Sequence, residues 1–198
     1  MTRAELKAKA KAQLQGKIGK IFLCMLIYFA ITLVCGMIPG VGGIVSFIIA
    51  APLSLGLYLV WLDMTYGKDP EVSTLFNGFQ YTGKALWLTI LVGVFTFLWT
   101  LLFYIPGIVK SISYSMSYYV LAENPNMTAR EALNVSKRIT NGHKMDLFVL
   151  SLSFIPWLLL SVVTCGIAFI YVMPYMYLTI TNFYHEIKDQ PQVETVVE

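Results

Sequence analysis

The sequence has little charge: Asp, Glu, Lys and Arg make up 13% of its 198 residues, whereas apolar residues make up 57%. A soluble domain of this length needs a charged shell between its apolar residues and water, and 14 Lys/Arg with 11 Asp/Glu are too few to form one. The composition therefore excludes a soluble globular protein and indicates an integral membrane protein. The long apolar runs also contain no Asp or Glu, which excludes a carboxylate-based proton or sodium relay of the usual pump type.

Motifs of enzymes and cofactor sites are also missing. The cysteines, Cys24, Cys35 and Cys165, are odd in number and imply no disulfide framework. The two histidines, His143 and His185, stand at the ends of apolar runs without metal-ligand spacing. The chain has no nucleotide-binding glycine loop, no nucleophile–base pair and no nucleic-acid-binding module. We expect a non-enzymatic protein with no cofactor, no metal and no nucleic-acid partner; a lipid-modifying enzyme that uses either histidine is an alternative.

Three stretches of the chain are apolar for longer than one membrane crossing requires. The run Ile21–Leu62 has no charge and is about twice the roughly 20 residues of one span, so it must fold back once. Leu86–Ala122, interrupted only by Lys110, and Leu147–His185 are each long enough for two spans. We expect the reversals at the glycine-containing turns Gly36–Gly43, Ile105–Gly107 and Thr164–Gly166. The sequence thus predicts an all-α, polytopic membrane protein with six transmembrane helices in three hairpins.

The basic residues are concentrated on one side of this arrangement. If both termini are cytoplasmic, every Lys and Arg except Lys110 lies on the cytoplasmic side, as the rule for positive charge near span ends requires. All acidic residues fall on the same side, so the external face consists of three short turns. We expect a multi-pass plasma-membrane protein with cytoplasmic N- and C-termini, whose partners are membrane lipids and anionic headgroups at the cytoplasmic face.

A similar pattern of residues occurs three times along the chain. A Gly-Lys pair, or Gly-His-Lys in the third copy, precedes each hairpin, and a turn residue follows its lysine after 22 residues. The turn residues at this spacing are Pro39, Pro106 and Gly166. The hairpins are therefore interpreted as a threefold pseudo-repeat.

A short interfacial amphipathic helix is predicted ahead of each hairpin. Capping boxes at Thr2/Glu5 and Thr128/Glu131 mark two of the starts, and Ser73 marks the middle one. The apolar faces are Leu6, Ala10, Leu14 and Ile18 in the first helix, Val72, Phe76 and Phe79 in the second, and Ala132, Val135 and Ile139 in the third. We interpret residues 1–198 as a single membrane domain with repeat units of about 1–67, 68–124 and 125–188. Residues 189–198 are expected to form a short, disordered cytoplasmic tail.

Small residues and prolines lie within the predicted spans. Gly42, Ser46, Ala50 and Ser54 recur every four residues, which predicts a helix-packing seam because small side chains let two helix backbones approach closely. Pro52, Pro156 and Pro174 each remove one backbone hydrogen bond and are expected to kink their helices. Plain kinks are the favoured interpretation, although broken helices also form binding sites in transporters.

The fourth predicted span is the most polar, and the sixth is its nearest counterpart. We expect these two helices to face each other or a shared polar cavity. The candidate ligand-binding residues are Lys110, Ser111, Tyr114, Ser117, Tyr118, Tyr171 and Tyr175. The simpler interpretation is interhelical hydrogen bonding without a ligand. For Lys110, snorkelling to the outer interface is favoured over a buried substrate-binding charge.

Several motifs, taken in order, resemble a known bacterial family. They are Thr2–Lys7, Pro52–Gly56, Leu75–Phe79, Tyr104–Ile108, Tyr114–Met116, Leu121–Pro125, Gly142–Lys144 and Leu152–Phe154. Over almost its whole length the chain is similar to the integral membrane family catalogued as domain of unknown function 975. The resemblance implies a six-helix fold in the bacterial plasma membrane and no agreed activity or catalytic residues. The family's more distant likeness is to the membrane portion fused to some glycerophosphodiester phosphodiesterases, whose hydrolase half this chain lacks.

Two classes of function remain after these exclusions. The leading hypothesis is a helical bundle that associates with lipids or with a partner, which is either another membrane protein or a second copy of the chain, in the bacterial envelope. The alternative is a small transporter or flippase for an amphipathic or anionic small molecule, lipid or peptide. In that alternative Lys110 stands at the outer mouth, and kinks at Pro52 and Pro174 permit movement.

Overall fold

The computed structural model describes residues 2–102, 104–164 and 166–189, except for the side chains of residues 102 and 104–106. The regular secondary structure in these residues is entirely helical, with no strand. The helices are α1 (Arg3–Leu14), α2 (Ile18–Gly36), α3 (Gly42–Thr65), α4 (Val72–Asn77), the 3₁₀ helix η1 (Gly78–Tyr81), α5 (Thr82–Leu102), α6 (Tyr104–Tyr114), α7 (Ser117–Glu123), α8 (Ala129–Ile139), α9 (Lys144–Leu152), α10 (Ile155–Val163) and α11 (Phe169–Lys188). The prediction of an all-α fold is confirmed for the described chain, and nearly all of the predicted tail lies outside it.

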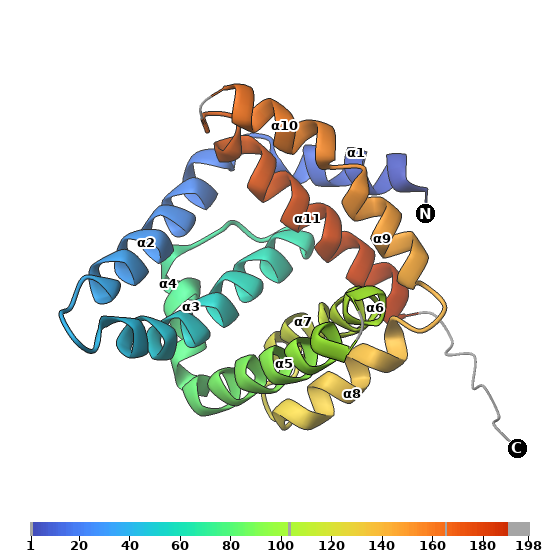
Figure 1. Ribbon diagram of the computed structural model, residues 1–198. Helices are drawn as coiled ribbons and strands as arrows, with labels where there is room; N and C mark the ends of the chain where they lie inside the picture. The colour runs from blue at the N-terminus through green and yellow to red at the C-terminus, as the bar shows by residue number, and fades with distance from the viewer. Residues whose placement is uncertain (1, 103, 165, 190–198) are drawn as a thin grey trace, which may run out of the picture.

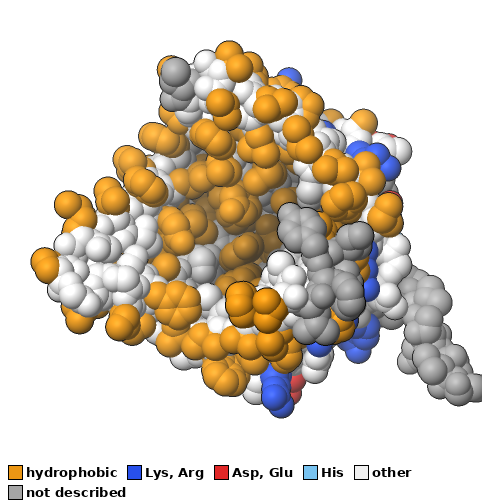
Figure 2. Space-filling view, viewed as in Figure 1, with side chains coloured by type: hydrophobic (Ala, Val, Ile, Leu, Met, Phe, Trp, Pro, Cys, Tyr) orange, Lys and Arg blue, Asp and Glu red, His pale blue; other side chains and the backbone are white. Residues whose placement is uncertain are grey.

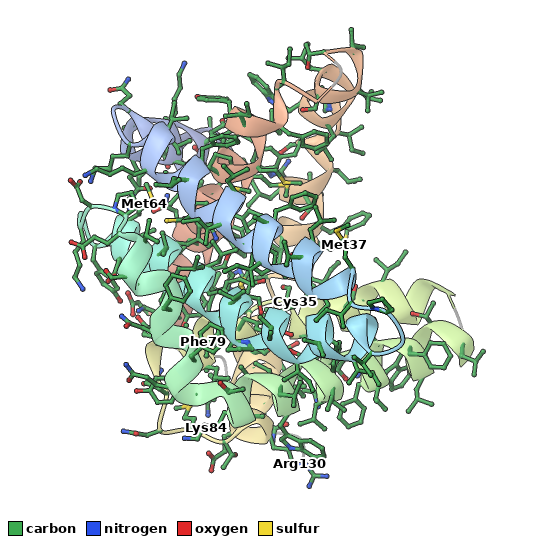
Figure 3. The ribbon with its side chains drawn as sticks, turned by 90° about the vertical axis from the view of Figure 1, so that its left-hand side faces the viewer. Cys35, Met37, Met64, Phe79, Lys84 and Arg130 are labelled. Atoms are coloured by element: carbon green, nitrogen blue, oxygen red, sulfur yellow. The ribbon has the colours of Figure 1, made fainter. Side chains whose placement is uncertain are left out.

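Three helical hairpins form the framework. Helix α2 packs against α3, α5 against α6 and α10 against α11, and Figure 1 shows the three pairs arranged around the middle of the molecule. The turns of the first two hairpins lie on the same side: in Figure 3 Met37, beside the α2–α3 turn, lies on the right, whereas Met64 at the other end of α3 and Lys84 near the start of α5 lie on the left. The molecule therefore has a turn end and an opposite end.

Much of the molecular surface is apolar, as a lipid-facing protein requires. Within the described residues four helical stretches are long and apolar enough to cross a membrane: Ile18–Gly36, Gly42–Thr65, Val72–Leu101 and Lys144–Val163. Hydrophobic side chains cover most of the face in Figure 2, with Lys and Arg gathered at its edge. Side chains such as Val163 are 79% exposed. An apolar surface this extensive is compatible with a membrane protein.

The fourth and sixth predicted spans differ from these four stretches. The fourth is divided into α6, of 11 residues, and α7, of 7 residues, and α6 alone is about 16 Å long, half the thickness of a bilayer core. Around the break the hydroxyls of Ser113, Ser115 and Ser117 all donate to carbonyls of α6 three or four residues earlier in the chain. Such local bonds compete with regular helix hydrogen bonding, which explains why this serine-rich stretch is not one straight helix. The sixth, α11, is continuous over 20 residues but carries many polar side chains.

Two of the three turns contain a glycine in the left-handed region, as the sequence predicts. Gly40 has φ +81° and Gly166 has φ +89°. The predicted second reversal at Ile105–Gly107 is wrong, because these residues lie inside α6, which begins at Tyr104 after α5 ends at Leu102. Gly107 has a different role: a Cβ there would lie 2.8 Å from the Cα of Thr100. Its missing side chain lets α6 approach α5 closely.

The starts of the first and third predicted short helices, α1 and α8, agree with the sequence. In α1 the Thr2 hydroxyl accepts a hydrogen bond from the Glu5 N–H at 3.3 Å, and the Glu5 carboxylate accepts one from the Thr2 N–H at 2.7 Å. Thr128 and Glu131 repeat this capping box at α8, so both predicted boxes are confirmed. The predicted start at Ser73 is wrong: Glu71 is the N-cap residue and α4 begins at Val72.

The apolar faces of α1 and α8 are covered by protein. Leu6, Ala10 and Leu14 are buried where α1 packs on α11. Ala132 and Ile139 are buried where α8 packs on α5, α6 and α7. The expectation that these two stripes lie on the membrane therefore needs correction, because partner helices fill the same need for apolar burial. In the second copy the predicted residues Phe76 and Phe79 are exposed.

Two of the family motifs pack directly on each other. A Cβ on Gly56 of α3 would lie 1.9 Å from the carbonyl oxygen of Leu75, and a Cβ on Gly78 would lie 2.0 Å from the carbonyl oxygen of Pro52. Leu75 is fully buried at this crossing. The two glycines therefore allow α4 and η1 to lie backbone-to-backbone on α3.

We predict that Gly78→Ala destabilises the protein by about 1–3 kcal/mol, because the methyl group would overlap the α3 backbone. The measurement is thermal unfolding in detergent followed by circular dichroism. Gly83→Ala is the matched control, since no atom lies within 4 Å of a Cβ at that position. Equal melting temperatures for the two variants would contradict the close packing of α3 against η1.

Candidate functional site

A central cavity lies where the three hairpins meet. It consists of two adjoining spaces of about 310 and 290 Å³ that share Tyr28, Ser54 and Tyr58. The remaining lining residues come from α2, α3, α5, α7 and α11: Met25, Phe29, Phe47, Ala50, Ala51, Leu57, Trp61, Thr89, Tyr118, Met173 and Tyr177. Figure 2 shows a hollow lined by hydrophobic side chains in the middle of this face. Each space is at the lower end of the range of about 300–1,000 Å³ for ligand sites.

Aromatic rings join the returning helices of the three hairpins beside this cavity. Tyr58 of α3 stacks on Tyr118 of α7, with ring centroids 5.1 Å apart, and meets Tyr119 edge-on at 4.6 Å. Tyr119 in turn stacks on Tyr184 of α11 at 5.4 Å. The Tyr118 hydroxyl donates to Thr89 Oγ1 at 2.8 Å. The cavity walls are thus rigid aromatic surfaces with a few phenolic hydroxyl groups.

A polar cluster connects the ends of the same three helices, and we call it the Glu123 clasp. It comprises Tyr66 after α3, Glu123 at the end of α7, and Tyr184 and Lys188 on α11. The hydroxyl of Tyr184 donates to Glu123 Oε2 at 2.7 Å, while the amino group of Lys188 and the hydroxyl of Tyr66 donate to Oε1. Beside the clasp, Thr65 Oγ1 lies 2.7 Å from His185 Nε2. One carboxylate therefore holds groups from all three hairpins.

The charge state of the clasp follows from these bonds. Partial burial disfavours ionisation of Glu123, but the hydrogen bonds from Lys188, Tyr66 and Tyr184 outweigh it and hold the pKa of this carboxyl below its usual value. Burial likewise opposes the charge on Lys188, and the hydrogen bond to Glu123 more than compensates, so that the pKa of Lys188 is raised. Both groups are charged at neutral pH, as an ion pair.

The two halves of the predicted packing seam on α3 have different neighbours. Near the turn, a Cβ on Gly42 would lie 2.4 Å from the carbonyl oxygen of Gly36, and Ser46 donates to the carbonyl of Thr32 at 3.0 Å, so both residues lie against α2. Farther from the turn, Ala50 and Ser54 line the central cavity. The same face of α3 therefore packs tightly on α2 at one end and borders a cavity at the other.

The three prolines within predicted spans also differ in position. Pro52 and Pro174 are buried inside the continuous helices α3 and α11. Pro156 lies in the first turn of α10, just after the helical interruption between α9 and α10. At that position a proline costs no helix hydrogen bond. Only Pro52 and Pro174 therefore interrupt hydrogen bonding inside a helix.

The candidate residues of the fourth predicted span do not share one environment. Tyr118 borders the central cavity, and the buried Ser117 donates to the carbonyl of Tyr114 at 2.6 Å. Tyr114 packs against Phe95 at 6.2 Å between ring centroids. Ser111 donates to the carbonyl of Ile108, and the Lys110 amino group lies 4.7 Å from the centroid of the Trp99 ring.

The candidates of the sixth predicted span lie elsewhere. Tyr171 and Tyr175 stack on each other at 5.8 Å, and Tyr175 meets Phe154 and Trp157 edge-on. They face α10 and Phe154 at its start, whereas Tyr114 packs on Phe95 and Lys110 on Trp99. Helices α7 and α11 do meet, but through Tyr119, Thr181 and Tyr184. The expected pairing of helices is found with other residues.

The residues at the true meeting point were not singled out from the sequence. Tyr58 and Tyr119 lie in apolar runs where nothing distinguishes them from core aromatics. Glu123 and Lys188 stand outside the predicted spans, where charge is expected for topological reasons alone. The usable signal was position: Tyr66, Glu123 and Lys188 each follow directly on the end of a returning span. Polar groups placed in this way on three hairpins can meet only if the hairpins pack side by side.

The fold and the surface define an all-helical bundle of the kind found in membranes. A family model described as "Protein of unknown function (DUF975)" matches residues 1–113 and 103–191, and the chain belongs to that family. The resemblance based on the sequence motifs is therefore confirmed. No curated protein and no solved structure gives a significant match.

We predict that Glu123→Gln lowers the stability of the protein by about 2 kcal/mol at pH 7, because it leaves the Lys188 charge without its partner. The pKa of Glu123 is lowered, so the stabilisation is present above about pH 4.5 and is lost as the pH falls below this value. The measurement is the melting temperature in detergent from pH 3 to pH 7, with the exposed Glu71→Gln as control. A constant difference between wild type and Glu123→Gln down to pH 3 would contradict the ionised clasp.

Proposed function

We propose that this protein is a non-enzymatic plasma-membrane protein that crosses the bilayer six times in three repeated hairpin units and binds a lipid chain in its central cavity. Both termini are cytoplasmic in this proposal. The observation that carries the function is the central cavity, whose walls are mostly apolar and whose polar side-chain groups, the hydroxyls of Tyr, Ser and Thr and the indole N–H of Trp61, are all uncharged. Such a site favours a hydrocarbon chain over a charged solute, because nothing in its lining neutralises a charge.

Equivalent lysines in two of the units support the repeat. Lys17 donates to the carbonyl of Lys68 at 3.2 Å, and Lys84 donates to the carbonyl of Pro125 at 2.6 Å. Each lysine therefore precedes its own hairpin and binds the loop that leaves the same hairpin. Ion pairs from Lys17 and Lys20 to Asp69 strengthen the first of these contacts. In both units the same long-range bond closes the base of a hairpin.

The distribution of polar contacts supports the orientation. The Glu123 clasp, the closing lysines and both capping boxes all lie at or beyond the ends of the hairpins opposite their turns. The turn end contains exposed hydrophobic residues such as Met37, Val41 and Ile167. A side with many cations and a side with few is the arrangement that places the cation-rich side in the cytoplasm.

A small transporter is the second candidate, and one observation favours it. The central cavity and the clasp lie on the same three helices, joined by the contact of Tyr119 with Tyr184. Tyr66, just after α3, is eight residues beyond Tyr58, so the clasp is about 12 Å along the helix axis from the cavity. Opening of the clasp would give the cavity a second exit, which a lipid-binding protein does not need.

We predict that cysteine labelling will find opposite sides for the turns and the surface helices. In a background without native cysteines, Val41→Cys reacts with an impermeant maleimide on intact cells, whereas Ala4→Cys and Asn126→Cys react only after permeabilisation. All three positions are exposed. Labelling of Asn126→Cys from outside would contradict the proposed orientation and the six spans.

We predict that Ser54→Phe abolishes lipid binding in the central cavity, because Ser54 lines both of its spaces and the larger ring would fill them. The measurement is cross-linking by a phospholipid with a diazirine on its acyl chain, mapped by mass spectrometry. The wild type should be labelled at Tyr28, Tyr58 or Met173, and Ser54→Phe several-fold less. Ser54→Ala keeps the space and should behave as the wild type. Equal labelling of the cavity in all three proteins would exclude this site.

A further inference from the structure

Two lysines converge on one face of the α5–α6 hairpin. The Lys110 amino group lies 4.7 Å from the ring centroid of Trp99. The Lys137 amino group lies 5.8 Å from the centroid of Phe95 and 5.4 Å from that of Tyr114. Phe95 and Trp99 are one helical turn apart on α5, a rise of about 6 Å, so the two ammonium groups occupy neighbouring turns of the same helix face.

Helix α8 is fixed in this position by hydrogen bonds to α6. The hydroxyl of Ser136, next to Lys137, donates to the carbonyl of Ser113 at 2.8 Å, and Thr140 donates to the same carbonyl at 3.5 Å. Lys110 lies one turn before Ser113 on α6. Helix α8 therefore brings Lys137 alongside the α5–α6 hairpin that carries Lys110.

This pair of cations has no counter-charge in the part of the chain that the structure describes. The salt bridges there involve Lys17, Lys20, Lys68, Lys188 and His143. Among the described residues neither Lys110 nor Lys137 has a carboxylate within 4 Å, and both amino groups lie against aromatic rings. Partial burial, together with the nearby Lys110 charge, lowers the pKa of Lys137. Two like charges this close are unfavourable unless an anion lies between them.

We propose that Lys110 and Lys137 form a binding site for the phosphate group of an anionic phospholipid. A phosphate accepts hydrogen bonds from both ammonium groups and relieves their repulsion. The aromatic rings contribute cation–π contacts that hold the amino groups in place.

A lipid is favoured over a free anion by the surface beside the site. On α5, Trp99 itself is 36% exposed, and Leu98 next to it is 46% exposed. These side chains lie in the candidate span Val72–Leu101, so acyl chains cover them in a membrane. A phospholipid meets both demands at once, with its phosphate on the lysines and its chains on this apolar surface. The site is separate from the central cavity, because none of its residues lines that cavity.

The test is selective lipid retention by the full-length protein in mild detergent, measured by native mass spectrometry. The probes are phosphatidylglycerol and phosphatidylcholine with the same acyl chains, and inorganic phosphate. Lys110→Gln/Lys137→Gln should bind phosphatidylglycerol roughly tenfold more weakly than the wild type, since each basic residue contributes to anionic-lipid binding. Lys110→Arg/Lys137→Arg should retain the binding. Lys9→Gln/Lys11→Gln, which removes two exposed cations from α1, is the matched control and should leave it unchanged.

The outcomes separate a site from general charge attraction. Equal weakening in the two Gln pairs, or no preference of the wild type for phosphatidylglycerol, would overturn the proposal. Binding of inorganic phosphate without retention of the lipid would overturn the lipid assignment. If the Gln pair does not fold, the single variants Lys110→Gln and Lys137→Gln carry the test, each with an expected weakening of about threefold. The inference rests on the proposed membrane insertion, but Ser54→Phe should leave this selectivity unchanged, so failure of the cavity and failure of the lysine site are distinguishable.

Discussion

The rest of the structure depends on a single carboxylate. Glu123 is partly buried at the end of α7, where an unpaired negative charge would be costly. Lys188 on α11 forms an ion pair with this carboxylate, and the hydroxyls of Tyr66 after α3 and Tyr184 on α11 donate hydrogen bonds to it. This requirement brings the three returning helices together at one end. Among the described residues no ion pair joins the turn ends, and the central cavity lies between the helices.

The features that the sequence predicted correctly depend on local chemistry. A capping box needs only Thr and Glu three residues apart, and Thr2/Glu5 and Thr128/Glu131 both form one. A glycine in the left-handed region is likewise a property of the turn itself, as at Gly40. The apolar runs indicated helices long enough to span a bilayer, because that signal comes from composition over 20 residues.

The features that could not be predicted depend on which helices meet. Periodicity places Tyr114 and Tyr118 on one face of a regular helix, but the serine-rich break at the end of α6 separates them, and they contact different neighbours. The apolar stripe of α1 is the same whether lipid or α11 covers it, since both offer apolar contact. The fourth and sixth predicted spans therefore meet through Tyr119 and Tyr184, and of the candidate residues Tyr118 borders the central cavity. Only packing distinguishes Tyr119 and Tyr184 from the other tyrosines of these segments.

Two groups of charged residues among those that the structure describes differ in what lies beside them. Glu123, Asp69 and Asp63 each have a lysine partner within the chain, and these pairs fasten helix ends and loops. Lys110 and Lys137 lie against aromatic rings and have no ion pair among the described residues, while Ser136 and Thr140 hold α8 against α6. Two lysines held on one helical hairpin without an ion pair in the described part of the chain are a place for an anion from outside. In a bilayer the anion present at high concentration beside an apolar helix is the lipid phosphate.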